Sequence, residues 1–593
     1  MSTSPGLPPV APSVTAELVE ALSPRLRKRL DAGVAKLAAR PVVHEGDTVR
    51  IAVDDDTDLE LHAPDGTVTE ADAIRCGCLL APGCLHRAAA ASAAPVAEDA
   101  PDPSPAPEAG AERGEAARPP VAATAAPDQL AAARAVYEAA AAVLAAGTDG
   151  SGAVLQAELL RAAHTARLAG LPRAAASAVS VVTGVRAARS ADPAYRLPEL
   201  VDALRGVLGV AHRLPFATGP DLAELRGSVR QPYTPDGSLR LYGLFSEPIL
   251  TASGYAGAVT WTADAEGRLY TVSDVAPGGP GRATGAADRA VRIGDTSLTH
   301  RELSRAGLAV SGATVSPTGR LGAGAGVRAV RAAGAAWHEA PLDRLWAAPA
   351  AAQVARALTG GLGDGHGLLF LDVTLAGTVR EATGDCLLAD CDGLALRLAM
   401  AHEDPALPYR DNLRLLAAAR GSRLRIVARL APGPLPRALL LAAEHPAGPD
   451  AGDARDARVD LGLDRLQRAD LPTAATAAPG SAPAVDEAPL HLLRRRVHQS
   501  VSGGRRVLAF PGSGAGDGGR LRSAGLATAA DLLDELQAAA ADRSRDAFGR
   551  LLPADTDRFA RAWLASAVYT AEVERTLCAA AWGARTEAIS LSL

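Results

Sequence analysis

The sequence predicts a multidomain α+β protein in which a small ββα unit is followed by a helical region, a β-rich middle and a helical C-terminus. Its 593 residues are too many for one ordinary core, because domains average about 150 residues. Apolar residues recur at helical spacing in some stretches and alternate, as they do in strands, in others. Two low-complexity stretches separate these regions, so several folded parts of different secondary structure are expected.

Charge and hydropathy narrow the possible functions. The formal net charge of −6 argues against a basic surface over the whole protein, although a local basic patch stays compatible with it. The chain has no run of about 18 apolar residues free of charge, so we predict no membrane span. The first residues lack the basic and apolar regions of a signal peptide. We therefore expect a cytoplasmic protein.

The first folded part is expected at residues 16–94, whereas residues 1–15, rich in Pro and Ser, are expected to lack regular structure. Ser23 before Pro24 is a typical helix start, and the helical pattern runs to about residue 39. The basic side chains of this helix, 24–40, are Arg25, Arg27, Lys28, Arg29, Lys36 and Arg40. We interpret it either as a face that contacts phosphates or as a solvated helix that packs on the strands that follow.

The strands expected next lie at 48–54 and 59–62, followed by a turn at 64–66 and a strand that ends near Cys76. A helical pattern resumes at residues 84–92.

Four potential metal ligands lie within eleven residues, in the pattern C-x-C-x5-C-x-H: Cys76, Cys78, Cys84 and His86. Three of the six cysteines cluster here, which favours metal binding in a reducing compartment over a disulfide scaffold. Zinc prefers four thiolate and imidazole ligands, and a Cys3His set leaves no position open for a catalytic water. We expect the small Gly77 to let both neighbouring thiolates face one ion. The alternative is a set of buried, inert cysteines beside an unrelated histidine.

A β-hairpin, then C-x-C, a short loop and C-x-H at the start of a helix resemble the SWIM-type zinc finger. Cys76, Cys78, Cys84 and His86 fall on the four ligand positions of that family. The resemblance covers about residues 45–95, and the wider architecture resembles long SWIM-containing proteins of actinobacteria. It implies a structural Zn²⁺ and a module that binds DNA or protein, and it names no reaction.

The rest of the chain is expected to form six further parts. Residues 95–126 have too few large apolar side chains to offset the entropy of an ordered chain, so they are predicted to be a disordered linker. The others are a helical region at 127–235, β-rich module 1 at 236–345, β-rich module 2 at 346–445, a linker at 446–486 and a C-terminal helical region at 487–593. Similar hairpin turns at 264–267 and 390–393 hint at a duplicated small β-barrel.

Other possible sites have simpler structural explanations. Gly514, Gly516 and Gly519 match a dinucleotide fingerprint in letters after a possible strand at 507–510, but the next helix is expected only near residue 528, so we predict a flexible loop. Cys386 and Cys391 are expected to be buried thiols in a strand. The acidic run 54–58 lacks the Gly and Glu of a calcium loop. Three histidines are expected to have surface, core or capping roles: His164, His338 and His402.

Two hypotheses about function follow. In the first, the protein is not an enzyme, and its finger and basic helix bind a protein or a nucleic acid. In the second, residues 127–593 form an enzyme of a class that the sequence does not name, and the finger recruits it. A deep pocket with converging charged side chains would favour the second hypothesis.

Overall fold

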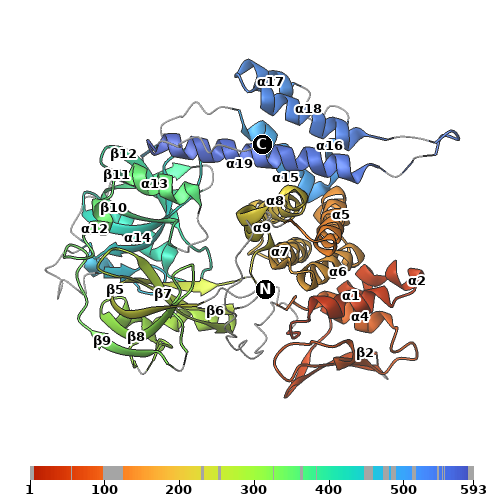
Figure 1. Cartoon of the computed structure of the whole chain (residues 1–593), viewed down its shortest axis with the longest axis horizontal. Coiled ribbons are helices and arrows are strands. Elements are labelled where there is room, and N and C mark those ends of the chain that lie inside the picture. Colours follow the sequence, from red (N-terminus) through yellow and green to blue (C-terminus); the bar gives the residue numbers. More distant parts are fainter. Residues whose placement is uncertain are drawn as a thin grey trace, which may run out of the picture. The chain divides into compact units, whose positions relative to one another are not determined.

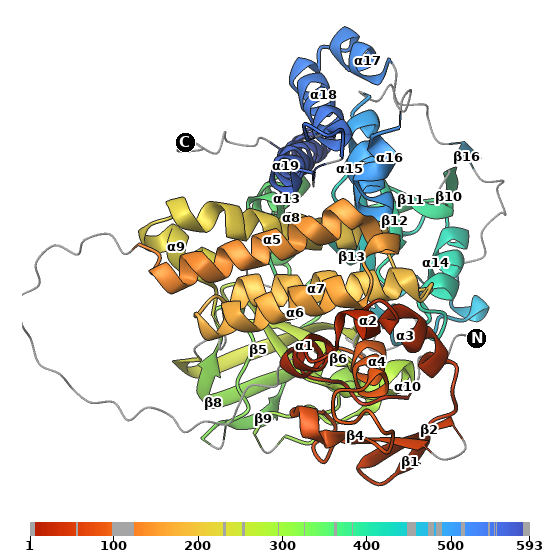
Figure 2. The ribbon, with the colours of Figure 1, turned by 90° about the vertical axis from the view of Figure 1, so that its right-hand side faces the viewer.

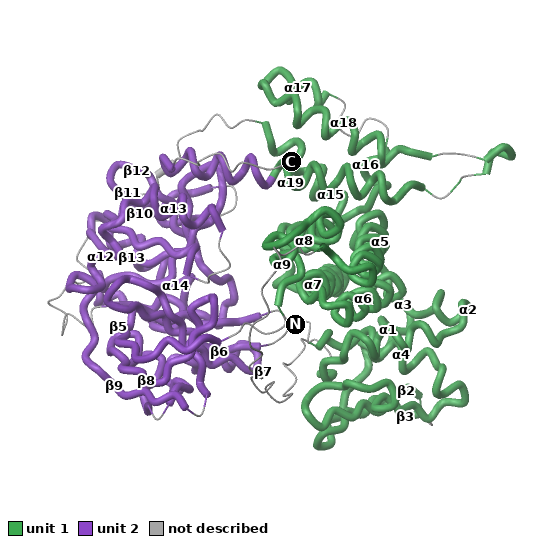
Figure 3. The backbone as a smooth tube through the Cα atoms, in the orientation of Figure 1, with its two compact units in different colours: residues 1–230, 488–570 green, residues 231–487, 571–593 purple. Residues whose placement is uncertain are grey.

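The computed structural model describes residues 6–54, 57–97, 124–228, 233–251, 255–294, 296–324, 326–360, 365–381, 384–446, 458–471, 480–481, 489–510, 516–543, 546–550, 552 and 554–584. These residues form a mixed α+β protein, as the sequence predicted. They divide into two compact units (Figure 3): residues 1–230 with 488–570, and residues 231–487 with 571–593.

The first unit begins with a small α+β module (Figure 1). Its sheet has the antiparallel order β1-β2-β3-β4, and helices cover it (Figure 2). The strands are β1 Val43–Glu45, β2 Thr48–Asp54, β3 Thr57–His62 and β4 Ile74–Cys76. The helices are α1 Pro12–Glu20, α2 Pro24–Arg27, α3 Leu30–Ala38 and α4 Leu85–Ala93.

Alternation along β2 and β3 sends Ile51, Leu59 and Leu61 into one core, where each is at most 1% exposed. The predicted strands and the helix after Cys84 are thus confirmed. Ser23 caps α2 as predicted, but the expected single helix 24–40 is broken between α2 and α3. The expectation that residues 1–15 lack regular structure is wrong for residues 12–15, because α1 begins at Pro12 and buries Val14, while residues 1–5 lie outside the described residues.

This module packs against the helices that follow it in the first unit. Ala153 and Ala157, on α6 Ala153–Leu168, belong to the same buried cluster as the strands. The Asp31 carboxylate accepts the amide of Ala153 at 2.9 Å, and so caps α6. Arg186 donates to the Ala94 carbonyl at 2.5 Å. These contacts join the module to the helices that follow residues 95–126 in the sequence.

The linker predicted at 95–126 lies largely outside the described residues, since 98–123 are not described. Its first residues pair with the N-terminal segment: the amide of Val10 donates to the Pro95 carbonyl, and that of Ala97 donates to the Val10 carbonyl, both at 2.9 Å. These bonds hold the start of the segment against the module.

Helices make up the rest of the first unit, around one large apolar core and a smaller one that includes Leu493, Leu521 and Leu533. They are α5 Pro127–Gly150, α6, α7 Pro172–Arg189, α8 Leu197–Arg213, α9 Gly219–Arg226, α15 His491–Gly503, α16 Arg505–Leu508, α17 Asp517–Ser523, α18 Ala527–Ala541 and α19 Thr556–Ala581, whose last residues belong to the second unit. The possible strand at 507–510 is wrong, because α16 occupies 505–508.

One described helix, α5, is long and apolar enough to cross a membrane by length and composition. Its buried side chains, including Val136 and Leu144, pack into the helical core.

The second unit contains two sheets with a similar order of elements: three strands, then one or two short helices, and two more strands. The first sheet has the order β7-β6-β5-β8-β9. It consists of β5 Thr234–Leu250, β6 Tyr255–Ala263, β7 Leu269–Pro277, α10 Gly279–Thr284, α11 His300–Leu303, β8 Gly307–Val315 and β9 Arg328–Ala332. The hairpin predicted around 264–267 joins β6 to β7.

The second sheet is a ring of pairings. β10 pairs with β11, β11 with β12, β12 with β14, β14 with β13, and β13 with β10 again. The elements are α12 Arg344–Ala347, α13 Ala350–Thr359, β10 Leu368–Glu381, β11 Gly384–Cys391, β12 Leu394–Met400, α14 Tyr409–Ala418, β13 Arg423–Leu430 and β14 Arg437–Glu444. The element order is thus similar in the two modules, while a duplicated barrel stays a prediction.

The predicted linker at 446–486 contains a buried segment. β15 Arg458–Asp460 pairs with β14, and β16 Gly480–Ser481 pairs with β10. Arg458 is 4% exposed, and its guanidinium donates to the carbonyls of Gly243 and Ser304 in the module of the first sheet. Residues 458–471 therefore fasten the two sheets of this unit together.

Candidate metal centre

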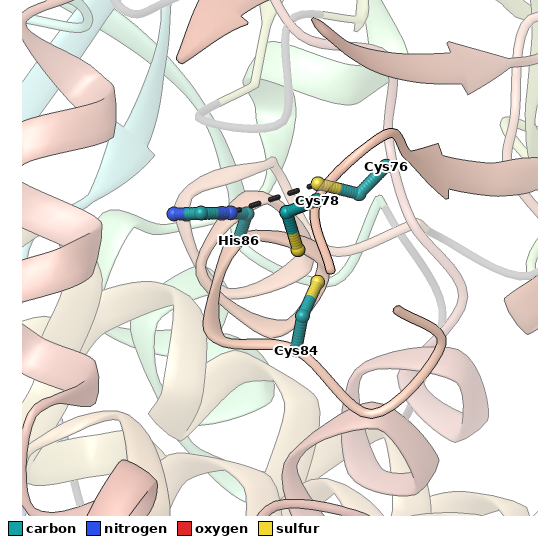
Figure 4. Close-up of side chains that lie close together, drawn as sticks. All are labelled: Cys76, Cys78, Cys84 and His86. Atoms are coloured by element: carbon teal, nitrogen blue, oxygen red, sulfur yellow. Dashed lines mark hydrogen bonds between the residues drawn. The ribbon is translucent and has the colours of Figure 1, made fainter. Parts of the chain in front are cut away.

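Four side chains converge at the point where β4 ends and α4 begins. The Sγ atoms of Cys76, Cys78 and Cys84 and a ring nitrogen of His86 all lie within 4.8 Å of one another. The Nδ1 atom of His86 lies 3.6 Å from the Cys76 sulfur, and Figure 4 shows the other ring nitrogen directed away. The three sulfurs and one nitrogen can therefore hold a metal ion.

The sheet places the first cysteine pair. Cys76 is the last residue of β4 and lies opposite Leu59 of β3, and the amide of Gly77 donates to the Asp58 carbonyl at 3.0 Å. The amide of Ala81 donates to the Cys78 carbonyl at 3.0 Å, which closes a turn directly after the pair.

Helix α4 places the second pair. Cys84 is its N-cap residue, with extended backbone angles, and His86 lies in its first turn. Leu85 packs against Gly33 of α3, where an added Cβ would lie 3.3 Å from the leucine. Cys84 is 2% exposed, whereas the other three ligands are half-buried. The cluster thus lies at the edge of the module with one ligand in its core.

Backbone amides face the sulfurs. Burial raises the pKa of the Cys76 thiol to about 12, against a lowering effect of the Cys78 amide, and burial also raises that of Cys84, against the Arg87 amide. At Cys78, burial is outweighed by the amides of Leu80 and Ala81 and by the neighbouring thiols, so its pKa is lowered. Such amides stabilise a thiolate, which is the form that binds a metal.

The residues present fit a closed metal site. Four ligands of this kind complete the tetrahedral shell of a structural ion, and a tetrahedron with bonds near 2.3 Å has edges of roughly 3.8 Å. The cluster, within 4.8 Å, approaches that size without a change of fold. The expected steric role of Gly77 is wrong: a Cβ there would make only an ordinary contact, 3.8 Å from the Asp58 carbonyl.

Arg87 holds the backbone around the cluster through hydrogen bonds, a role that was not predicted from the sequence. Its guanidinium donates from Nε to the Ile74 carbonyl at 2.5 Å, from Nη1 to that of Pro82 at 2.6 Å, and from Nη2 to that of Ala71. One side chain, 5% exposed, therefore ties β4, the loop between the cysteine pairs and the turn before β4 to helix α4. An arginine inside an alanine-rich, buried helix was the available signal.

The other cysteines lie apart from this cluster. Cys386 and Cys391 are buried in β11, as predicted, and burial raises the pKa of both, that of Cys391 to about 11. Cys578 is buried on α19. Within the residues that the structure describes, Cys76, Cys78, Cys84 and His86 form the one group of side chains suited to a metal ion.

The remaining candidate sites have structural roles where they are described. His164 is exposed, the amide of Asp404 donates to His402 Nδ1 at 3.0 Å, and His338 pairs with Glu444. Gly514 and residues 55–56 of the acidic run lie outside the described residues. Gly516 caps α17, a short helix that was not predicted, and the helix expected near residue 528 is α18, which begins at Ala527.

The enzyme hypothesis for residues 127–593 stays a prediction. A hollow beside β9 is lined by Thr296, Ser297, Leu298, Glu302, Ala329, Val330 and Arg331. The Glu302 carboxylate, which lines this hollow, accepts a hydrogen bond from the Thr299 amide at 2.8 Å in the capping box of α11. This bond lowers the pKa of Glu302.

Comparison with known proteins gives no relative: no protein-family model, no curated protein and no solved structure matches this chain.

Proposed function

We propose that this chain is a cytoplasmic zinc protein whose Cys3His cluster is a structural SWIM-type finger, and that the finger-bearing module binds a protein or a nucleic acid. The carrying observation is the convergence of four donor atoms within 4.8 Å from a C-x-C pair at a strand end and a C-x-H pair at a helix start. Zinc is the metal that best fits three thiolates and one imidazole in a closed shell.

A structural role for the ion follows from the ligand count. Three sulfurs and one nitrogen fill a tetrahedral shell, so no position remains for a reacting water. The ion would join β4 to α4, as Arg87 also does through its three carbonyl partners. We therefore expect the metal to fix the shape of a surface loop and to take no part in a reaction.

Metal analysis of the full-length protein, purified without chelators, tests the proposal. We expect one zinc ion per chain in the wild type, and loss of nearly all of it in Cys78→Ala. Cys391→Ala is the matched control, because it removes a buried thiol far from the cluster in sequence and should keep the ion. A wild type without metal, or a Cys78→Ala variant that keeps it, would contradict the proposal.

The nucleic-acid form of the proposal needs a separate measurement. Contacts between phosphates and the cations of residues 25–40 would make DNA affinity fall steeply as salt rises. A band-shift titration at low salt with no shift would remove that form and leave protein as the partner.

A further inference from the structure

Two leucines in the metal-binding loop are displayed to solvent. We define the ligand loop as residues 77–83, the segment between the two ligand pairs. Leu79 is 103% exposed and Leu80 is 63% exposed, so both side chains lie mostly in solvent. Single exposed apolar residues are common, but two neighbouring leucines on a loop that is fixed at both ends form a small apolar surface.

The ligand loop is held in place by backbone hydrogen bonds. The amide of Ala81 donates to the Cys78 carbonyl at 3.0 Å. The carbonyl of Pro82 accepts a hydrogen bond from Arg87 at 2.6 Å. The loop is thus fixed while the side chains of Leu79 and Leu80 lie in solvent.

A basic segment follows the turn that the ligand loop contacts. An added Cβ at Gly83 would lie 3.9 Å from the Ala21 carbonyl, so the ligand loop adjoins the turn that leads into α2. The exposed cations that follow are Arg25, Lys28, Arg29 and Lys36. Among the residues that the structure describes, none of these four forms an ion pair. Arg75, in β4 and two residues before the ligand loop, is also exposed.

We propose that Leu79 and Leu80, with the four exposed cations between Arg25 and Lys36, bind an acidic segment of a partner protein that carries large apolar side chains. This inference rests on the proposed function, since the bound metal holds the loop. An acidic, apolar peptide satisfies both halves of the surface: its carboxylates meet the cations and its apolar side chains remove the leucines from water. A nucleic acid would neutralise the cations and leave both leucines exposed.

Fluorescence anisotropy with the zinc-loaded, full-length protein tests the inference. The probes are labelled peptides in which Asp and Glu alternate with Leu and Phe, the same peptides with Ser in place of Leu and Phe, a DNA duplex, and vesicles of anionic phospholipid. We expect the acidic apolar peptides to bind at least about tenfold more tightly than the serine peptides. We also expect the double variant Leu79→Ser/Leu80→Ser to remove this preference.

Control variants separate the inference from the proposed function. Leu168→Ser changes a leucine that is 75% exposed on α6 and should leave peptide affinity unchanged. Zinc content is measured on every variant, because the leucine changes spare all four ligands. Full zinc content without peptide preference overturns the inference alone, whereas absence of zinc from the wild type overturns the proposed function. Leucine-dependent binding to vesicles, or binding to DNA only, also overturns the inference.

Discussion

Replacing Arg87 with Met should loosen the metal-bearing part of the module while leaving all four ligands in place. The change removes a buried cation from three backbone carbonyls, those of Ile74, Ala71 and Pro82. A hydrogen bond from a charged donor contributes about 1.5–3 kcal/mol, and a buried acceptor left without a partner costs about 1–3 kcal/mol.

Loss of the guanidinium should cost a different free energy at each of the three carbonyls. Ile74 is 0% exposed, so its carbonyl has no access to water and bears the full penalty, roughly 2 kcal/mol. Ala71 is half-buried and Pro82 is exposed, so water replaces much of what they lose. The ion pair with Asp72, whose side chain is 98% exposed, adds little. The expected cost of the substitution is therefore about 3 kcal/mol in local stability.

Hydrogen exchange measured by mass spectrometry gives the readout, because the protein has two units and no single unfolding transition is assured. A cost of about 3 kcal/mol predicts roughly 100-fold faster exchange of the protected amides in β4 and α4. Arg75→Met is the matched control, since Arg75 is exposed and bonds only the Asp72 carbonyl, at 3.4 Å. Unchanged exchange in Arg87→Met, or an equal effect in the control, would refute the reasoning.

Three further predictions concern metal removal, the packing of the module and pH. Chelation of the metal should speed exchange in residues 76–86 but spare β2 and β3, because Ile51, Leu59 and Leu61 are buried without its help; collapse of the whole sheet would show that the core depends on the ion. Asp31→Ala should cost about 1 kcal/mol and speed exchange in the first turn of α6, whose amide at Ala153 it caps, and an unchanged turn would count against that cap. Burial lowers the pKa of His300 from 6.5 to about 4. Between these pH values the unfolded chain binds a proton that the native chain does not, so up to about 3 kcal/mol of stability is lost as pH falls through this window. Urea unfolding followed by tryptophan fluorescence should show this loss in the wild type and a smaller loss in His300→Gln, and equal losses would exclude the histidine as the cause.

Local patterns in the sequence predicted much of the N-terminal module. Alternating apolar residues located β2 and β3, and the spacing of Cys76, Cys78, Cys84 and His86 located the cluster, because both depend on neighbours in the chain. The same holds for the hairpin between β6 and β7, whose turn residues are contiguous.

Long-range contacts set what the sequence could not reveal. Low complexity at 95–126 predicted a disordered linker, which gave no sign that Asp31 bonds the amide of Ala153, 122 positions further along the chain. Similarly, composition suggested a linker at 446–486, but buried Arg458 bonds carbonyls more than 150 positions away. Polar partners of this kind leave no periodic pattern, so only the folded chain identifies them.

X-ray absorption at the zinc edge of the purified full-length protein tests the central claim most directly. We predict a coordination shell of three sulfurs at about 2.3 Å and one nitrogen at about 2.0–2.1 Å, supplied by Cys76, Cys78, Cys84 and His86. A shell of oxygen and nitrogen without sulfur, or no zinc signal at one equivalent per chain, would contradict it.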